Sequence, residues 1–284
     1  MSVSSTNPAH STELPVYRIA PAHGWIPVRL GELWEYRELL YFMVWRDVKV
    51  RYKQTALGVA WAVMQPFFTM VVFSIFFGKL AKIPTGGVPY PVLVYCALMP
   101  WQLFAFALTE SSNSVVANQR LLTKVYFPRL LMPIAAVCMG LADFAVSFVV
   151  LLLLMAYYGI APGWAALTVP LWAIFAVAVA IAVGLWLSAL NVRYRDIRYT
   201  LPFLTQLWLI ATPVVYPSAL VPEAWRGVYA LNPMVGVVDG FRWALVGGPS
   251  PQATLGVSAI AVLVILVSGL LYFRRTERTF ADVV

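Results

Sequence analysis

Charged residues are scarce in this sequence: only 11% of its 284 residues are Asp, Glu, Lys or Arg, whereas 61% are hydrophobic. A water-soluble domain needs more charge to cover its surface, so the composition excludes that class and predicts a polytopic membrane protein. Cysteine is also rare, and both cysteines, Cys96 and Cys138, lie in apolar stretches. Buried, inert thiols are therefore expected in place of a disulfide or a metal site.

Motifs for nucleotide and metal binding are missing as well. The sequence has no G-x-x-x-x-G-K-[ST] loop, because its only Gly-Lys pair, Gly78-Lys79, is followed by Leu. That loop cradles phosphate groups, so no cofactor is expected on this chain, and any ATP must be hydrolysed by a partner. The two histidines, His10 and His23, provide no metal constellation. The net charge of +8 is dispersed among loops beside apolar runs, which argues against nucleic-acid binding.

Six apolar runs have the length and polarity of membrane spans, so the expected fold is all-α. Residues 57–284 would form this six-span domain, with spans at about 57–78, 90–110, 131–158, 164–190, 201–216 and 254–273. The fifth run is short for a crossing. With the N-terminus inside, 16 of the 20 Lys and Arg fall on the inner side, a bias that predicts cytoplasmic termini.

The N-terminal part is expected to contain a cytoplasmic tail, residues 1–30, and then an amphipathic helix in the membrane surface, residues 31–56. The helix ends in four cations that abut the first span: Arg46, Lys49, Arg51 and Lys53. Such cations attract anionic headgroups at about 1 kcal/mol each. Two interpretations are open, docking of a lipid pyrophosphate and anchoring to bulk acidic lipid.

Three spans carry helical faces on which aromatic rings alternate with amides and hydroxyls. These faces comprise Trp61, Gln65, Phe68, Thr69 and Phe76, then Tyr95, Gln102, Phe106, Thr109 and Asn113, and finally Thr205, Trp208, Thr212 and Tyr216. Rings pack against the apolar faces of pyranoses while amides and hydroxyls exchange hydrogen bonds with sugars, which predicts a sugar channel. The alternative is helix packing, in which polar side chains join neighbouring helices.

One acidic residue, Asp143, lies near the middle of the third span. An ionisable group there costs about 2.5–3.5 kcal/mol on insertion scales, so it should face protein or water. A hydrogen bond to Ser147 or to a neighbouring helix is expected, and a proton relay is the alternative. Glu110, near the cytoplasmic end of the second span, could snorkel or pair with Arg120 or Lys124.

Two apolar pieces, Pro222–Leu231 and Met234–Val246, are too short to cross a membrane and are separated by Asn232-Pro233. Re-entrant or interfacial helices on the outer side are expected. An outer gate is one hypothesis for this region, formed by Trp225, Asp239, Arg242 and Trp243 together with Tyr216. A local ion pair between Asp239 and Arg242 is the default interpretation.

Five segments, 46–73, 123–137, 191–203, 231–247 and 273–284, resemble the membrane subunit of bacterial O-antigen polysaccharide exporters. These exporters belong to the ABC-2 group of ABC transporters. The resemblance implies a homodimer in the bacterial inner membrane, with two copies of a separate ATPase subunit that binds ATP and Mg²⁺ and can carry a carbohydrate-binding domain. The cargo would be a polyprenyl-pyrophosphate-linked polysaccharide.

The resemblance also implies contacts between two inner loops and the ATPase. The first is a short coupling helix, Gln119 to Tyr126, with Leu121, Leu122 and Val125 as apolar anchors beside Arg120 and Lys124. The second is the 191–199 loop, with Arg193, Arg195 and Asp196. Residue spacing alone also allows an ordinary interfacial turn in the first loop and an Arg–Asp surface pair in the second.

Other functions remain as alternatives. ABC-2 exporters of capsule, teichoic acid or small molecules share the architecture, and a secondary transporter would use Asp143 and Glu110 as proton sites. A membrane glycosyltransferase would need clustered carboxylates on an inner face, where the loops offer only Asp196. The chain is therefore expected to have no catalytic residues of its own.

Overall fold

The structure, a computed structural model, describes residues 30–53, 58–122, 124–278 and 280. Within these ranges the secondary structure is helical, as predicted, with no strand. The predicted tail falls almost wholly on residues 1–29, which lie outside the described residues. So do residues 54–57, where the predicted interfacial helix meets the first span.

Five helical segments in the described part are long and apolar enough to cross a membrane. They are α3 (Gly58–Phe73) with the π-helix η1 (Ser74–Leu80), α4 (Tyr90–Ala117), α6 (Leu131–Tyr157), the 3₁₀-helix η2 (Trp164–Thr168) with α7 (Val169–Arg193), and α11 (Gln252–Glu277). The predicted fifth span corresponds to α8 (Ile197–Ala211), which has only 15 residues. At about 1.5 Å per residue it is roughly 22 Å long, shorter than a hydrocarbon core of about 30 Å. Thr212–Tyr216, placed in that span by the sequence, lie beyond the end of the helix.

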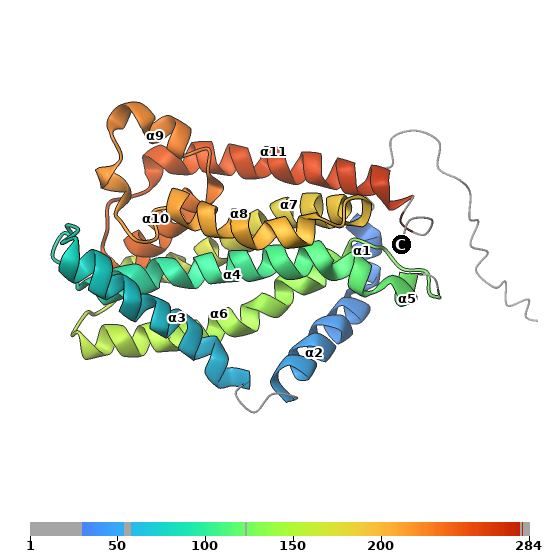
Figure 1. Ribbon diagram of the computed structural model, residues 1–284, viewed down its shortest axis with the longest axis horizontal. Coiled ribbons are helices and arrows are strands. Elements are labelled where there is room, and N and C mark those ends of the chain that lie inside the picture. The colour runs from blue at the N-terminus through green and yellow to red at the C-terminus, as the bar shows by residue number, and fades with distance from the viewer. Residues whose placement is uncertain (1–29, 54–57, 123, 279, 281–284) are drawn as a thin grey trace, which may run out of the picture.

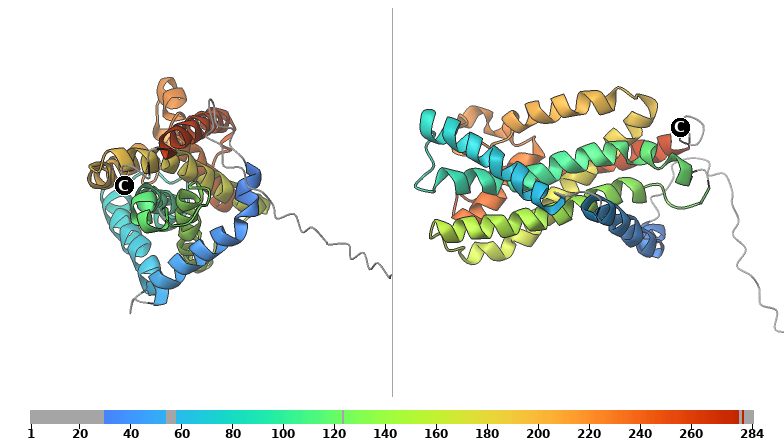
Figure 2. Two further views of the ribbon diagram at one scale, coloured as in Figure 1. Left: turned by 90° about the vertical axis from the view of Figure 1, so that its right-hand side faces the viewer. Right: turned by 60° about the horizontal axis from the view of Figure 1, so that its bottom comes forward.

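The long helices run side by side along the long axis of the molecule (Figure 1). At one end, here called the α5 end, lie α1 (Leu30–Glu35), α5 (Gln119–Leu122) and the last turns of α11. At the opposite end, the α9 end, lie η1, α9 (Glu223–Tyr229) and the 3₁₀ turn η3 (Ser218–Leu220). The views in Figure 2 show α2 (Arg37–Lys53) slanting across the side of the bundle near the α5 end.

Helix α4 is the centre of the main core. It packs against α3, α6, α7, α8 and α10 (Pro233–Val246), and most of its side chains are buried. Its approach to α7 depends on Gly184, where an added Cβ would meet the Ser111 hydroxyl at 2.5 Å. Asn191 fastens the same two helices by donating to the Ser112 carbonyl at 3.0 Å. Helix α4 continues to Ala117, past residue 110 where the sequence placed the end of the second span, and Ser111, Ser112 and Ser114 are buried in this extension.

A second core lies at the α5 end. Met43 of α2 packs there with Phe127 and Leu130 of the segment after α5, and with Phe273 and Phe280 near the C-terminus. Arg129 donates a hydrogen bond to the Glu277 carbonyl, which ties the two segments together. On the other sides of α1 and α2, Trp34, Tyr41 and Trp45 are exposed, so apolar groups are not confined to one face. Placement of this helix in the membrane surface stays a prediction.

The two short pieces before α11 form α9 and α10, which are separated at Asn232-Pro233 as predicted. The Asn232 carboxamide caps α10 by accepting from the Met234 backbone N–H at 3.1 Å. It also accepts from the Trp208 indole at 3.0 Å and donates to the Thr212 hydroxyl at 3.0 Å. One amide therefore joins the end of α8 to the start of α10. Their description as re-entrant helices stays a prediction.

Candidate functional site

A cavity of about 420 Å³ lies between α3, α4, α6 and α8 and reaches the last turn of α2. On α4 its lining extends from Leu98 to Glu110, a distance of about 18 Å at 1.5 Å per residue. The cavity is therefore elongated along the bundle axis. Its other lining residues are Arg51, Trp61, Ala62, Gln65, Thr69, Met99, Trp101, Gln102, Leu103, Ala105, Phe106, Thr109, Gly140, Asp143, Phe144, Ser147, Pro202, Thr205 and Leu209.

The cavity brings together residues of all three faces that the sequence assigned to a channel. Each of the three spans contributes: Trp61, Gln65 and Thr69 from α3, Gln102, Phe106 and Thr109 from α4, and Thr205 from α8. Amides, hydroxyls and rings thus surround one space. The Thr109 and Thr205 hydroxyls donate to carbonyls of their own helices, at 3.1 and 2.9 Å, which leaves their oxygen lone pairs able to accept from a ligand.

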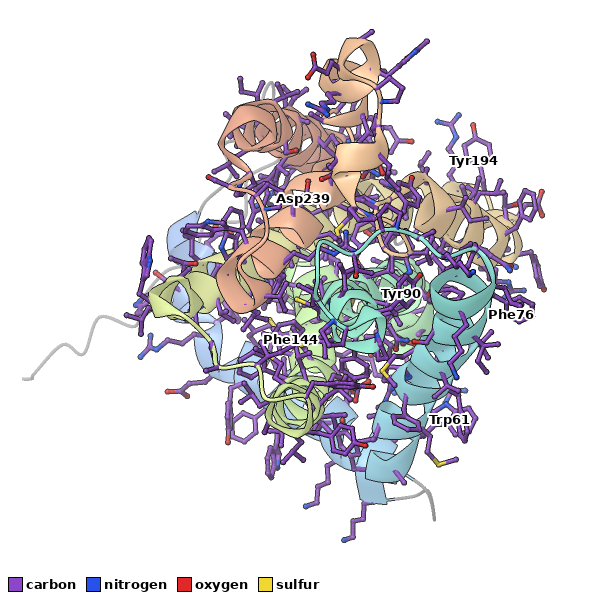
Figure 3. All side chains as sticks on the ribbon, turned by 90° about the vertical axis from the view of Figure 1, so that its left-hand side faces the viewer. Trp61, Phe76, Tyr90, Phe144, Tyr194 and Asp239 are labelled. Atoms are coloured by element: carbon purple, nitrogen blue, oxygen red, sulfur yellow. The ribbon has the colours of Figure 1, made fainter. Side chains whose placement is uncertain are left out.

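Other members of those faces lie elsewhere. Phe68 on α3 and Phe76 on η1 are exposed, and Tyr95 is fully buried in the main core. Figure 3, a view along the bundle from the α9 end, shows Phe76 on the rim and Phe144 among the helices. A helical face is about 100° wide or more, so sequence spacing alone does not separate cavity-lining positions from their neighbours.

The remaining four members join helices to one another. The Asn113 amide receives a hydrogen bond from Asn191 at 3.2 Å. Trp208 packs edge-on against Phe104 at 5.0 Å and bonds to Asn232, which also holds Thr212. The Tyr216 hydroxyl lies 3.0 Å from that of Tyr229. For these residues the structure supports the packing interpretation.

A charged corner of the cavity is formed by Arg51 and Asp143. An Arg51 guanidinium nitrogen lies 2.7 Å from an Asp143 carboxylate oxygen, and the Tyr52 hydroxyl donates to the other oxygen. The same guanidinium lies over the Phe106 ring, 4.4 Å from its centroid. Burial and the hydrogen bond to Asp143 raise the pKa of Tyr52.

This corner bears on two predictions. Asp143 was expected to bond to Ser147 or to a neighbouring helix, and the structure gives it two partners on α2, Arg51 and Tyr52. Arg51, grouped by the sequence with three surface cations, is engaged with Asp143 and is 33% exposed, so its docking role stays a prediction. Of the others, Arg46 pairs with Asp47 at 2.8 Å, while Lys49 and Lys53 are exposed.

Helix α6 supplies a wall of the cavity that the sequence interpretation missed. Its lining residues are Gly140, Asp143, Phe144 and Ser147. Their spacing of i, i+3, i+4 and i+7 places them on one face of a helix, so the signal was present in the sequence. The face is hard to recognise because Gly140 and Phe144 are apolar, and the sequence joined Asp143 and Ser147 to each other instead of to a cavity.

The predicted coupling segment is helical for only four residues, Gln119–Leu122, and Thr123 lies outside the described part. Gln119, Arg120 and Lys124 are exposed, whereas Leu121 and Leu122 pack against the second core. Val125 and Tyr126 are 56% and 82% exposed and lie beside a shallow pocket of about 250 Å³. The outward apolar groups are thus Val125 and Tyr126, not the two leucines.

The second inner loop joins α7 to α8. Arg193, Arg195 and Asp196 are all exposed there, and the structure shows no ion pair among these three residues. The Arg193 guanidinium lies 5.6 Å from the centroid of the Tyr194 ring. The surface-pair interpretation is therefore not supported, and the loop presents charged groups to solvent at the α5 end.

The four residues proposed for an outer gate lie at the α9 end, in different environments. Arg242 does not form the expected ion pair with Asp239: its guanidinium donates to the carbonyls of Val214 at 2.8 Å, Tyr216 at 2.9 Å and Leu93 at 3.4 Å. It thereby fixes the segment after α8 against α4. Trp243 contacts the edges of two other indoles, whereas Trp225 is exposed on α9.

Comparison with known proteins adds evidence from outside the chain. A model of the ABC-2 type transporter family matches residues 38–246. The O-antigen export system permease protein RfbA of Myxococcus xanthus is 30% identical over 256 residues, covering 88% of this chain and 97% of that protein. A protein of the same name from Klebsiella pneumoniae is 27% identical over 250 residues, 87% and 95% of the two chains. The polysialic acid transport protein KpsM of Escherichia coli is 24% identical over 239 residues, 82% and 91% of the two chains. The family match extends from α2 to α10 and includes the four helices around the cavity.

Proposed function

Because the chain belongs to the ABC-2 type transporter family, we propose that it is the membrane-spanning permease subunit of a polysaccharide exporter. ATP hydrolysed on a separate subunit would drive lipid-linked polysaccharide of the O-antigen type from the cytoplasm across the bacterial inner membrane. The cavity carries this proposal: three faces of rings, amides and hydroxyls converge on one elongated space, which suits a sugar chain. The names of the relatives at 27% and 30% identity support the choice of polysaccharide.

The proposed topology has six crossings with α8 as the fifth. Its 15 residues fall short of the hydrocarbon thickness, which local thinning of the bilayer or packing against α4 and α7 can accommodate. The α5 end would face the cytoplasm, since it gathers both described termini and the two basic inner loops. In this arrangement α2 lies at the inner surface, and α9 and α10 lie on the outer side.

A second copy of the chain is the proposed neighbour on the open side of the cavity. The outer sides of α3 and α8 expose Phe67, Phe68, Phe203 and Leu207 next to the lining residues. Two copies facing each other across α3 and α8 would enclose a channel between them. The ATPase, with its ATP and Mg²⁺, would contact Val125 and Tyr126, with Arg193, Arg195 and Asp196 as a second contact.

The anionic end of the carrier lipid would be attracted to the inner surface of α2 by Lys49 and Lys53, which are exposed. ABC-2 exporters of other cargo, including capsule, teichoic acid and small molecules, remain the second candidate. A proton-coupled transporter is less well supported, because Asp143, its proposed proton site, is engaged by Arg51 and Tyr52.

Retention of the ATPase by the purified permease tests the proposal. Tyr126→Asp should release a co-purified ATPase by placing a charge in the apolar contact. Tyr157→Asp is the matched control, because Tyr157 is equally exposed, at 82%, on the far end of α6. Leu121→Asp is less informative, since Leu121 packs in the second core and its loss would unfold that region. Equal retention by the two Tyr variants would refute the coupling assignment. Transport by the chain alone, in vesicles without an ATPase, would refute the function.

A further inference from the structure

The charges that line the cavity do not balance. Of the 21 lining residues in the part of the chain that the structure describes, three are ionisable: Arg51, Glu110 and Asp143. Arg51 and Asp143 neutralise each other through their 2.7 Å contact, and Tyr52 holds the carboxylate in place. Glu110 forms no ion pair among the described residues and is exposed at the end of the cavity nearest α5. Arg51 also acts electrostatically on Glu110, but one cation cannot balance two carboxylates, so the formal charges of these three groups sum to one negative charge in each subunit.

We propose that this cavity selects a polysaccharide of uncharged or amino-bearing sugars and discriminates against acidic sugars. The inference rests on the proposed function and concerns the cargo at that same cavity. The remaining lining groups suit neutral sugars, since amides and hydroxyls exchange hydrogen bonds with sugar hydroxyls. Rings such as Trp61 and Trp101 offer apolar surfaces for pyranose faces. An ammonium group on a sugar would be attracted by Glu110 and by the ring faces.

An acidic sugar would meet repulsion in every repeat unit that passes. For two like charges about 8–10 Å apart at an effective dielectric constant near 20, the Coulomb penalty lowers affinity by a factor of about 15 to 35. In a dimer two copies of Glu110 would act on the same chain. The carrier's phosphate groups cross once per polymer, whereas a sugar carboxylate would bear this cost at each repeat.

The positions of Lys49 and Lys53 agree with a cavity that excludes acidic sugars and a membrane surface that attracts the anionic carrier lipid. Lys49 and Lys53 are exposed on α2 outside the cavity, and neither is among its lining residues. They can attract an anionic headgroup at the membrane surface without drawing anionic sugars inward. The one cation inside, Arg51, is occupied by Asp143. Positive charge is thus available at the surface and cancelled in the cavity.

Binding of two soluble oligosaccharides to the permease–ATPase complex in lipid nanodiscs tests the proposal. The probes are a neutral oligomannoside and an oligosialic acid of equal length, measured by equilibrium dialysis at low salt. The neutral probe should bind at least about tenfold more tightly, as expected from the Coulomb factor. Glu110→Gln should narrow the ratio of the two affinities by about the same factor. Glu223→Gln is the control, because it removes one carboxylate from an 88% exposed site on α9 and should leave the ratio unchanged.

The outcomes separate the two levels of the argument. Equal or tighter binding of the acidic probe, or an unchanged ratio in Glu110→Gln, would overturn the charge selection alone. Failure of both probes to bind the wild-type complex would overturn the proposed function and this inference with it. An equal change of the ratio in Glu223→Gln would show that the effect comes from overall charge and would also overturn the assignment to the cavity.

Discussion

The contact between Arg51 and Asp143 joins the end of α2 to the middle of α6, and its contribution to stability can be worked out from the structure. The perturbation is a double-mutant cycle of Arg51→Gln and Asp143→Asn, which removes each charge while keeping a polar side chain of similar size. The ion pair is 2.7 Å long, and its side chains are 33% and 21% exposed. It is therefore neither a surface pair nor a fully buried one.

The expected magnitude lies between the two limiting cases. Exposed ion pairs contribute about 0–1 kcal/mol, and breaking one partner of a buried pair costs about 3–5 kcal/mol. For this partly buried pair we expect a coupling energy of about 1–3 kcal/mol. Arg51→Gln should cost more than Asp143→Asn, because it also removes the cation–π contact with Phe106, typically about 0.5–2 kcal/mol.

The assay is the free energy of unfolding from reversible denaturant titration in mixed micelles. The double variant should be less destabilised than the sum of the two single variants, since removing both charges leaves none unpaired. Arg46→Gln and Asp47→Asn form the control cycle, because that pair of neighbours on α2 has side chains 48% and 29% exposed. Its coupling should be at most about 1 kcal/mol. Additive effects at Arg51 and Asp143, no larger than in the control cycle, would refute the assigned role.

The same unfolding measurement tests three further features. Gly240→Ala should destabilise by about 1–3 kcal/mol or more, because its Cβ would lie 2.2 Å from the Trp172 ring. Gly256→Ala is the control: its Cβ would meet nothing within 4 Å, so it should be neutral or stabilise by up to about 1 kcal/mol. Equal effects of the two substitutions would contradict the close contact between Gly240 and Trp172. Arg242→Met should cost about 2–4 kcal/mol by removing the donor to two buried carbonyls and one partly buried carbonyl, and a loss under about 1 kcal/mol would contradict that role. Asn232→Ala should cost about 1–3 kcal/mol through the lost cap and the bonds between α8 and α10, and an unchanged unfolding free energy would contradict it.

Local sequence patterns were sufficient for several elements. The length and apolarity of the runs predicted α3, α4, α6, α7 and α11, because a helix that is apolar over about 20 residues is stable in lipid. The break at Asn232-Pro233 followed from the missing N–H of proline. Seven of the predicted channel residues line the cavity because helical periodicity places residues three and four apart on one face.

Apolar sequence patterns did not predict where a helix ends or which apolar side chains face outward. The apolar run at 201–216 reads as one span, yet the helix ends at Ala211, and the next residues turn toward the carbonyl contacts of Arg242. Leu121 and Leu122 read as outward anchors, yet they pack on the second core and leave Tyr126 outside. In both cases a local apolar pattern is compatible with two environments.

The sequence by itself determined the class of protein and part of the cavity lining, because both depend on hydrophobic length and on periodicity within single helices. Only the tertiary structure decided which polar groups are bonded to protein and which are left for a ligand. Tyr52 and Asp143 are 91 positions apart, and Asn113 and Asn191 are 78 apart. Hydrogen bonds and ion pairs are short-range, so their partners are fixed by how the helices pack. The pairing of Arg51 with Asp143, and with it the position of Glu110 outside any ion pair among the described residues, follows from the tertiary structure and not from the sequence.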